Sequence, residues 1–337
     1  MSEPAKLPKE FSHYPLRTSR RGHFWVPGEI VETPEGMHAQ RAPLYVEWEA
    51  PAEITKPYPL VLVHGGGGQL TDWRGTPDGR PGWMDRFVDA GYLVYAVDRP
   101  AHGRSWAHPD IVGAPGSMFA YELAIGLFSA EIPGHDQGVW ENVIGDPNLD
   151  QMVAAMGYFP EDLAESQRLD QDRIARLLDR IGPAILVTHS ASGPAGWLVA
   201  DARPELVKAI CAIEPMGPPF TGAFATLDYG IAKAPLSYEP PVTDTAALEA
   251  AAPGTYTLPN LAGIPVVVMV AAASPFTSWG HLMADYINAA GGQAEFMNFA
   301  DAGVHGNGHA MMFEKNSDEA IVPVLAWLAQ VGAPLET

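Results

Sequence analysis

The chain has 337 residues, of which 47% are apolar, so it can bury the core of one large domain or of two small ones. Its 40 acidic and 20 basic residues give a net charge of −20, which argues against nucleic acid or an anionic membrane surface as a partner. The 34 glycines and 32 prolines predict many turns and long irregular connections. We therefore expect a globular protein with a solubilising acidic surface.

Three features of the chain bear on its compartment. A single cysteine, Cys211, leaves no intrachain disulfide, and its apolar neighbours predict a small buried side chain. Residues 1–10 carry prolines and charges where a secretion signal needs an unbroken apolar run. The most apolar window, residues 261–275, is too short to span a bilayer. We expect a cytoplasmic protein with no membrane partner, and a homodimer is left open.

Predicted strands and helices alternate along most of the chain. Early β candidates at 23–32 and 44–49 precede the apolar strand 59–63, and later strands are predicted at 92–97, 184–187, 207–213, 264–271 and 295–299. Helices are predicted near 83–90, 162–181, 281–290 and 317–330, and from residue 191 onward. Such alternation is typical of a mostly parallel sheet with helices on both faces and functional groups at the carboxyl ends of its strands. We predict a single α/β domain over residues 1–337.

Two stretches interrupt this alternation, at about 101–160 and 216–260. Structureless loops of that length are uncommon in a compact domain, so we predict that both are lid or cap insertions. Their many aromatic side chains suit an apolar pocket wall, and they equally suit packing of the lid onto the sheet.

Four glycines, residues 65–68, follow His64 directly after the strand 59–63. Glycine lets the backbone adopt positive φ and approach a ligand, which an oxyanion hole needs if peptide N–H groups are to point at a developing negative charge. A phosphate-binding Walker loop would continue with Gly-Lys-Ser/Thr, whereas Gln69 follows here, and no G-x-G-x-x-G opens a helix. We predict that Gly66 or Gly67 supplies an oxyanion donor and that no cofactor is needed.

Ser190 lies at the corner between the apolar strand 184–187 and the next predicted helix. A serine at such a corner carries its Oγ clear of both elements, and the residues two before and two after it must be small. Thr188 and Ser192 occupy those places, which makes this a relaxed form of the G-x-S-x-G turn. We predict Ser190 as a nucleophile and the N–H of Ala191 as a second oxyanion donor.

A serine nucleophile needs a base, and the base needs an orienting acid. His305 and His309 lie in a glycine-rich segment after the last predicted strand, and both are candidate bases. The glycines between them disfavour a helix that would align the two for zinc, so no metal is predicted. Glu214 ends the strand after the nucleophile strand, where an isolated charge would be costly and needs a partner. Glu214 is the favoured acid, with Asp301 in reserve; the alternative is that Glu214 caps a turn or pairs with an arginine.

Together these motifs resemble a bacterial esterase family of the α/β-hydrolase superfamily that uses a Ser-His-Glu triad, with the glutamate after the sixth strand. Sulfonylurea-herbicide de-esterifying carboxylesterases are similar. The matching segments are 63–65, 76–83, 98–105, 189–190, 213–215 and 306–312. Most of the superfamily places the acid after the seventh strand, but residues 271–281 hold no carboxylate. The resemblance therefore implies an α/β-hydrolase fold, with Ser190, His309 and Glu214 as the triad.

The resemblance implies a serine carboxylesterase that acts on a small-molecule ester through an acyl-enzyme. Aromatic lid residues and the scarcity of lysine and arginine favour a neutral, fairly apolar ester. Arg80 and Arg104 either bind a substrate carboxylate or tie their own loops together. A lactone, a carbamate or a carbon–carbon bond could be cleaved by the same residues; less favoured alternatives are an oxidoreductase and a catalytically silent binding protein.

Overall fold

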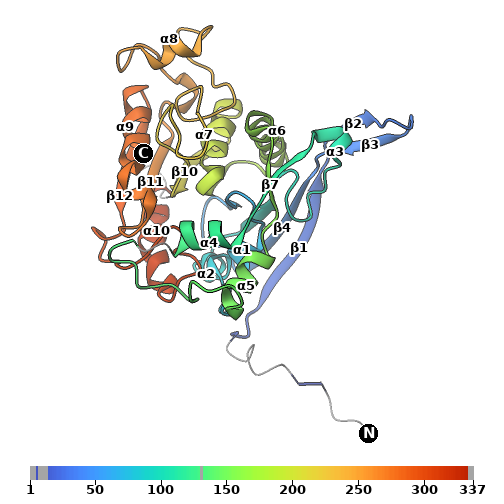
Figure 1. Ribbon diagram of the computed structural model, residues 1–337, viewed down its shortest axis with the longest axis vertical. Helices are drawn as coiled ribbons and strands as arrows, with labels where there is room; N and C mark the ends of the chain where they lie inside the picture. Colours follow the sequence, from blue (N-terminus) through green and yellow to red (C-terminus); the bar gives the residue numbers. More distant parts are fainter. Residues whose placement is uncertain (1–4, 7–13, 130–131, 333–337) are drawn as a thin grey trace.

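The computed structural model describes residues 5–6, 14–129 and 132–332 (Figure 1). Of the segment 1–10, on which the prediction of no secretion signal rests, all but residues 5 and 6 lies outside the described residues. Within the described ranges, no helix is both long enough and apolar enough to cross a membrane.

An eight-stranded sheet forms the centre of the fold, in the spatial order β1-β4-β6-β5-β9-β10-β11-β12. Its strands are β1 (Ser19–Val26), β4 (Leu44–Pro51), β5 (Leu60–Val63), β6 (Val94–Asp98), β9 (Ala184–His189), β10 (Val207–Ile213), β11 (Pro265–Val270) and β12 (Gln293–Asn298). Strands β1, β4 and β6 pair antiparallel, and every pair from β6 to β12 is parallel. The mostly parallel sheet predicted from the alternation is confirmed.

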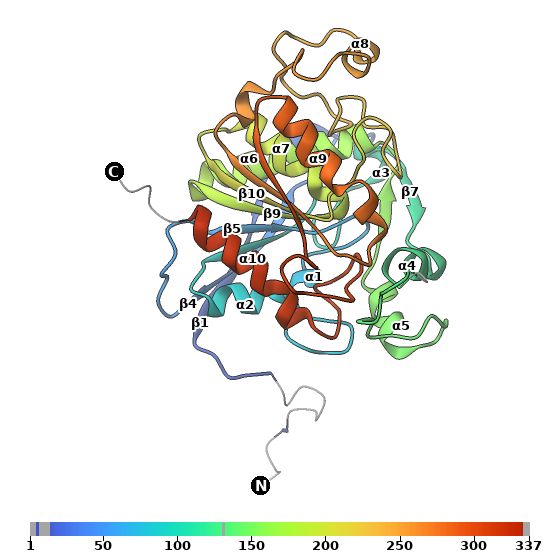
Figure 2. The same ribbon diagram turned by 90° about the vertical axis from the view of Figure 1, so that its left-hand side faces the viewer.

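Helices cover both faces of this sheet, as the edge-on view in Figure 2 shows. The helices are α1 (Thr71–Arg74), α2 (Trp83–Asp89), α3 (Pro109–Val112), α4 (Tyr121–Phe128), α5 (Pro147–Ala154), α6 (Leu163–Ile181), α7 (Gly193–Ala202), α8 (Thr245–Glu249), α9 (Gly280–Ala289) and α10 (Ser317–Val331), with 3-10 turns η2 (Ser190–Ser192), η3 (Pro259–Leu261) and η4 (Pro275–Ser278). Helices α2 and α10 lie on one face, and α6, α7 and α9 lie on the other. Each face has its own buried apolar cluster, and Cys211 is fully buried in the first, as predicted.

Helix α6 illustrates how local sequence defines an element. Asp162 caps its N-terminus by accepting a hydrogen bond from the N–H of Glu165, and Gly182 ends it with φ 84°, a conformation that glycine adopts without strain. Its buried residues include Ile174, Leu177 and Leu178, and the last two follow Ile174 at the spacing of three and four that places side chains on one helix face. The predicted helix 162–181 is therefore confirmed almost to the residue.

The two stretches predicted as insertions contain short elements rather than long ones. The first holds α3, β7 (Pro115–Met118), α4, α5 and β8 (Tyr158–Pro160), and β7 pairs with β8 in a two-stranded ribbon. The second holds α8 and η3, and α8 lies beyond the ends of α7 and α9 in Figure 1. Their role as lids stays a prediction.

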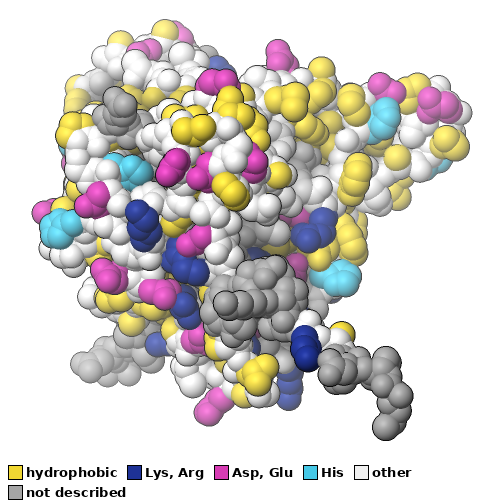
Figure 3. Space-filling model, turned by 60° about the horizontal axis from the view of Figure 1, so that its bottom comes forward, with side chains coloured by type: hydrophobic (Ala, Val, Ile, Leu, Met, Phe, Trp, Pro, Cys, Tyr) yellow, Lys and Arg dark blue, Asp and Glu magenta, His cyan; other side chains and the backbone are white. Residues whose placement is uncertain are grey.

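A narrow hairpin extends from the sheet edge at β1 (Figure 1). It consists of β2 (Glu29–Glu32) and β3 (His38–Arg41), and the Arg173 guanidinium on α6 ties Glu29 to the body. On the face drawn in Figure 3, acidic side chains are scattered among apolar and neutral ones instead of gathering in one patch.

Candidate active site

Ser190 lies in the tight turn η2 that joins the buried strand β9 to helix α7. Its φ of 56° is in the left-handed region, which residues other than glycine rarely adopt. The turn brings α7 close to the end of β10. A Cβ on Gly193 would lie only 2.6 Å from the Cβ of Pro215, so glycine is needed at this position. Thr188 stands where the usual turn has glycine. Its side chain lies against Gly196, which has no side chain of its own, so the threonine fits without a clash. These close approaches hold the Ser190 side chain out from the carboxyl end of β9.

A chain of hydrogen bonds runs from Ser190 through His309 to Glu214. The Nε2 of His309 lies 2.9 Å from the Oγ of Ser190, and its Nδ1 lies 3.0 Å from the Oε2 of Glu214. His309 and Glu214 are fully buried, whereas Asp301 and His305 are exposed. Of the candidate bases and acids in the sequence, the fold therefore brings His309 and Glu214 to the serine.

The segment that usually carries the acid instead supplies donors to Glu214. The backbone N–H of Ala271 donates to Oε1 at 2.6 Å, and the hydroxyl of Ser274 donates to Oε2. Burial raises the pKa of the Glu214 carboxyl to about 8, and both donors act in the opposite direction. Burial also lowers the pKa of His309 to about 3, so the imidazole rests in its neutral form.

The glycine loop lies against Ser190. A Cβ on Gly65 would be 3.1 Å from the Cβ of Ser190, and one on Gly66 would be 3.2 Å from the Cβ of Ala191. The carbonyl of Gly65 accepts hydrogen bonds from the Nδ1 of His64 at 2.8 Å and from the Nη1 of Arg99 at 3.4 Å. The backbone N–H of Arg99 donates to the Nε2 of His64, which leaves Nδ1 as the protonated nitrogen. The 65–66 peptide is thus fixed in orientation.

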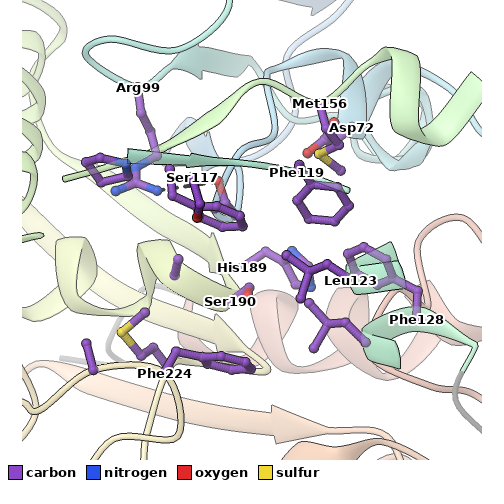
Figure 4. A pocket seen from close by; sticks show the side chains of 18 of the residues that line it. Asp72, Arg99, Ser117, Phe119, Leu123, Phe128, Met156, His189, Ser190 and Phe224 are labelled. Atoms are coloured by element: carbon purple, nitrogen blue, oxygen red, sulfur yellow. Dashed lines mark hydrogen bonds between the residues drawn. The ribbon is translucent and has the colours of Figure 1, made fainter. Parts of the chain in front are cut away.

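The Ser190 hydroxyl faces a cavity of about 330 Å³. Figure 4 shows Phe119, Leu123 and Phe128 on one side of the serine and Phe224 below it. Gly66 and Ala191 line this cavity, whereas Gly67 lines a neighbouring one. The walls are mainly apolar, so the cavity suits a ligand with apolar groups on both sides of the serine.

Neither of the two arginines that the sequence left between two roles lines the Ser190 cavity. Arg80 donates to the carbonyls of Phe313 and Glu314 and pairs with Asp78. Arg104 lies over the ring of Tyr45 at 5.2 Å. Arg99, in contrast, lines the Ser190 cavity, but its guanidinium is held by Asp170 in a buried ion pair.

Several residues of the site were not found from the sequence. Ser274 had one usable signal, because it lies where related folds carry the acid. Glu314 had none: it accepts hydrogen bonds from the Gly308 N–H at 2.9 Å and from the Asn307 amide at 2.7 Å, and so holds the loop before His309. The ring of Phe276, which stacks on His309, also had none, whereas Phe128, the other stacked ring, belongs to the aromatic residues of 101–160 for which the sequence suggested a pocket wall.

Among the described residues, no group of three or more His, Cys, Asp or Glu side chains is arranged to hold a metal ion.

A sequence model of the alpha/beta hydrolase fold matches residues 58–235, a range that includes the glycine loop, Ser190 and Glu214. The chain belongs to the α/β-hydrolase family. The predicted superfamily and fold, and with them the prediction of a hydrolytic enzyme, are confirmed.

Two comparisons cover more of the chain than the sequence model does. A protein from Fungal sp. (strain ATCC 74256), named "Probable secreted lipase phiG", is 36% identical over 312 residues, which make up 85% of each chain. The solved structure titled "The Atomic Resolution Structure of a Novel Bacterial Esterase" has a TM-score of 0.69 and 24% identity, and the match covers 97% of this chain and 100% of that one. The second comparison supports the fold alone.

Proposed function

We propose that this hydrolase is a serine carboxylesterase that cleaves a neutral, fairly apolar carboxylic ester. The observation that carries the proposal is the hydrogen-bond chain from Ser190 through His309 to Glu214, which opens on a mainly apolar cavity. The names of the lipase and esterase to which the chain is similar agree with it.

In the proposed mechanism, Ser190 attacks the ester carbonyl while His309 takes its proton at Nε2. Glu214 keeps the Nδ1–H tautomer of His309 and stabilises the imidazolium that forms. His309 then gives the proton to the leaving alcohol, and the acyl group remains on Ser190 as an ester. Water attacks this acyl-enzyme with His309 as base, which releases the acid and restores the serine.

The oxyanion of each tetrahedral intermediate would be bound by the N–H groups of Ala191 and Gly66. Both residues line the cavity beside Ser190. Because the C=O and N–H of a trans peptide point in opposite directions, the bonds that hold the Gly65 carbonyl also fix the direction of the Gly66 N–H. Each such donor is typically worth roughly 3 kcal/mol of barrier. Gly67, the other glycine considered from the sequence, is the less favoured donor because it lines the neighbouring cavity.

The size of the cavity favours small esters. At about 330 Å³ it is near the lower end of the range for ligand pockets, roughly 300–1,000 Å³. We therefore expect short or medium acyl chains to be better substrates than long ones. The same triad could also cleave a lactone, a carbamate or a carbon–carbon bond.

A fluorophosphonate probe tests the proposal directly. Incubation, digestion and mass spectrometry should locate the adduct on Ser190, and p-nitrophenyl esters of increasing chain length should be turned over, with the shorter ones preferred. If the probe does not react with Ser190 and no ester is hydrolysed, Ser190 is not the nucleophile of an esterase and the proposal fails.

The hydroxyl of Ser274 should set the pH range of activity. It donates to Glu214, and this bond favours the ionised carboxylate that the proposed mechanism requires. Activity should therefore fall as the pH drops below about 8, the pKa to which burial raises the Glu214 carboxyl. Ser274→Ala should raise that pKa further and move the acid limb of kcat/KM upward by roughly 1–2 pH units.

Ser278→Ala is the matched control for this profile. Ser278 lies in the same turn, η4, but its hydroxyl is exposed and donates to the carbonyl of Pro275. Its pH–rate profile should overlay that of the wild type. An unshifted acid limb in Ser274→Ala would show that Glu214 does not control the profile.

The cytoplasmic location stays a prediction. The curated relative carries "secreted" in its name, so fractionation of the native host is the experiment that decides between the two compartments.

A further inference from the structure

Two phenyl rings lie nearly parallel to the His309 imidazole and close to it. The ring of Phe276 lies 4.1 Å from it between centroids with the planes 19° apart, and the ring of Phe128 lies 5.6 Å away with the planes 18° apart. Both are stacked arrangements, and His309 has no exposed surface. The imidazole is therefore packed against aromatic rings and shielded from solvent.

The edges of the imidazole are occupied as well. Nδ1 faces Glu214 and Nε2 faces Ser190, while the tilted ring of His189 lies 4.8 Å away. His189 donates its Nε2–H to the carbonyl of His309, and burial lowers the pKa of His189 to about 3, so this neighbour stays neutral. A positive charge on His309 would thus be stabilised by the Glu214 carboxylate and by the electron density of the two phenyl rings.

Each phenyl ring is itself held by other rings. Phe119 stacks on Phe128 at 6.0 Å, and Trp279 and Phe224 lie 4.6 Å and 6.0 Å from Phe276. Phe128 and Phe119 belong to the first insertion and Phe224 to the second, on different sides of Ser190 in Figure 4. These contacts keep the two rings parallel to the imidazole before any charge forms, so no reorganisation is needed when the proton moves.

We propose that Phe276 and Phe128 are positioning residues that stabilise the His309 imidazolium through their ring faces, and that both insertions hold them in place. The proposal rests on the proposed function, in which the proton of Ser190 passes to Nε2 as the Oγ–carbon bond forms. The face of a phenyl ring carries negative potential and attracts a cation within about 6 Å of its centroid. Both distances are below this limit, and Phe276 is the nearer ring.

Fluorinated phenylalanines at position 276 test this inference. Mono-, di- and trifluoro-phenylalanine progressively withdraw electron density from the ring face with little change in size. The value of kcat/KM for a p-nitrophenyl ester should fall stepwise, by about 2- to 30-fold over the series, the range expected for loss of one cation–π contact. The imidazolium pKa of His309, followed by NMR, should fall in the same order.

The matched control is the same series at Phe299, an equally buried core ring with no ring contact to His309 within the described part of the chain. It should leave kcat/KM within twofold of the wild type. Phe276→Leu keeps an apolar side chain but removes the ring, and it should resemble the trifluoro variant.

Equal decreases at positions 276 and 299, or no decrease at 276, would overturn the inference and leave Phe276 as packing alone. Failure of the proposed function is recognised separately, because then the wild type neither turns over esters nor reacts with the fluorophosphonate. The NMR titration of His309 needs no turnover, so it decides the question of the ring faces in that case too.

Discussion

Ser190→Ala should lower kcat for a p-nitrophenyl ester by about 10⁶, the loss typical when such a nucleophile is removed. The physical reason is that no other hydroxyl lies within hydrogen-bond distance of the His309 Nε2 among the described residues. Steady-state kinetics with a protein sample free of contaminating esterases, together with fluorophosphonate labelling, make the measurement.

The fold of this variant should be unaffected. Alanine removes a hydroxyl that is hydrogen-bonded to His309, and the backbone bond from the Met216 N–H to the Ser190 carbonyl remains. Circular dichroism and the urea midpoint should match those of the wild type. Turnover within about tenfold of the wild type would show that Ser190 is not the nucleophile.

Glu214→Gln should lower kcat by about 10⁴, a loss seen when an orienting carboxylate becomes an amide and the imidazole takes the wrong tautomer. The N–H of Ala271 is fixed by the backbone and points at the Oε1 position, so the amide oxygen should settle there. The amide NH₂ then faces the Nδ1 of His309 and turns it into an acceptor. The imidazole proton then moves to Nε2, and Nε2 can no longer accept the proton of Ser190.

Asp301→Asn is the control for this result, because Asp301 is the other carboxylate that the sequence allowed as the acid. It is exposed, and kcat should stay within about twofold of the wild type, as for most surface substitutions. A large loss in Asp301→Asn with little loss in Glu214→Gln would exchange the two roles.

Local signals in the sequence predict the parts of the site that one short segment defines. The glycine loop after β5 and the serine between β9 and α7 are each formed by consecutive residues, so their turn geometry follows from glycine content and from the apolar strand before them. Helix α6 follows from its cap and its apolar spacing in the same way. The prediction of Glu214 as the acid depends on its position at the end of β10. Parallel pairing brings that strand end beside the end of β9.

Contacts between residues far apart in the chain distinguish candidates that local sequence treats alike. His305 and His309 have similar glycine-rich surroundings, and only the packed loop, held by Glu314, buries one and exposes the other. The ribbon of β7 and β8 pairs strands that are about 40 residues apart in the chain, so no local pattern predicts it.

The sequence by itself therefore determined the fold class, the glycine loop and the serine turn of this protein, because backbone geometry and apolar spacing are properties of neighbouring residues. Only the tertiary structure decided which donors meet Glu214, which glycine lies beside Ala191 and which rings enclose His309. Those contacts depend on segments that meet only when the sheet packs against the stretches 101–160 and 216–260, and burial then sets the pKa values of the groups they surround.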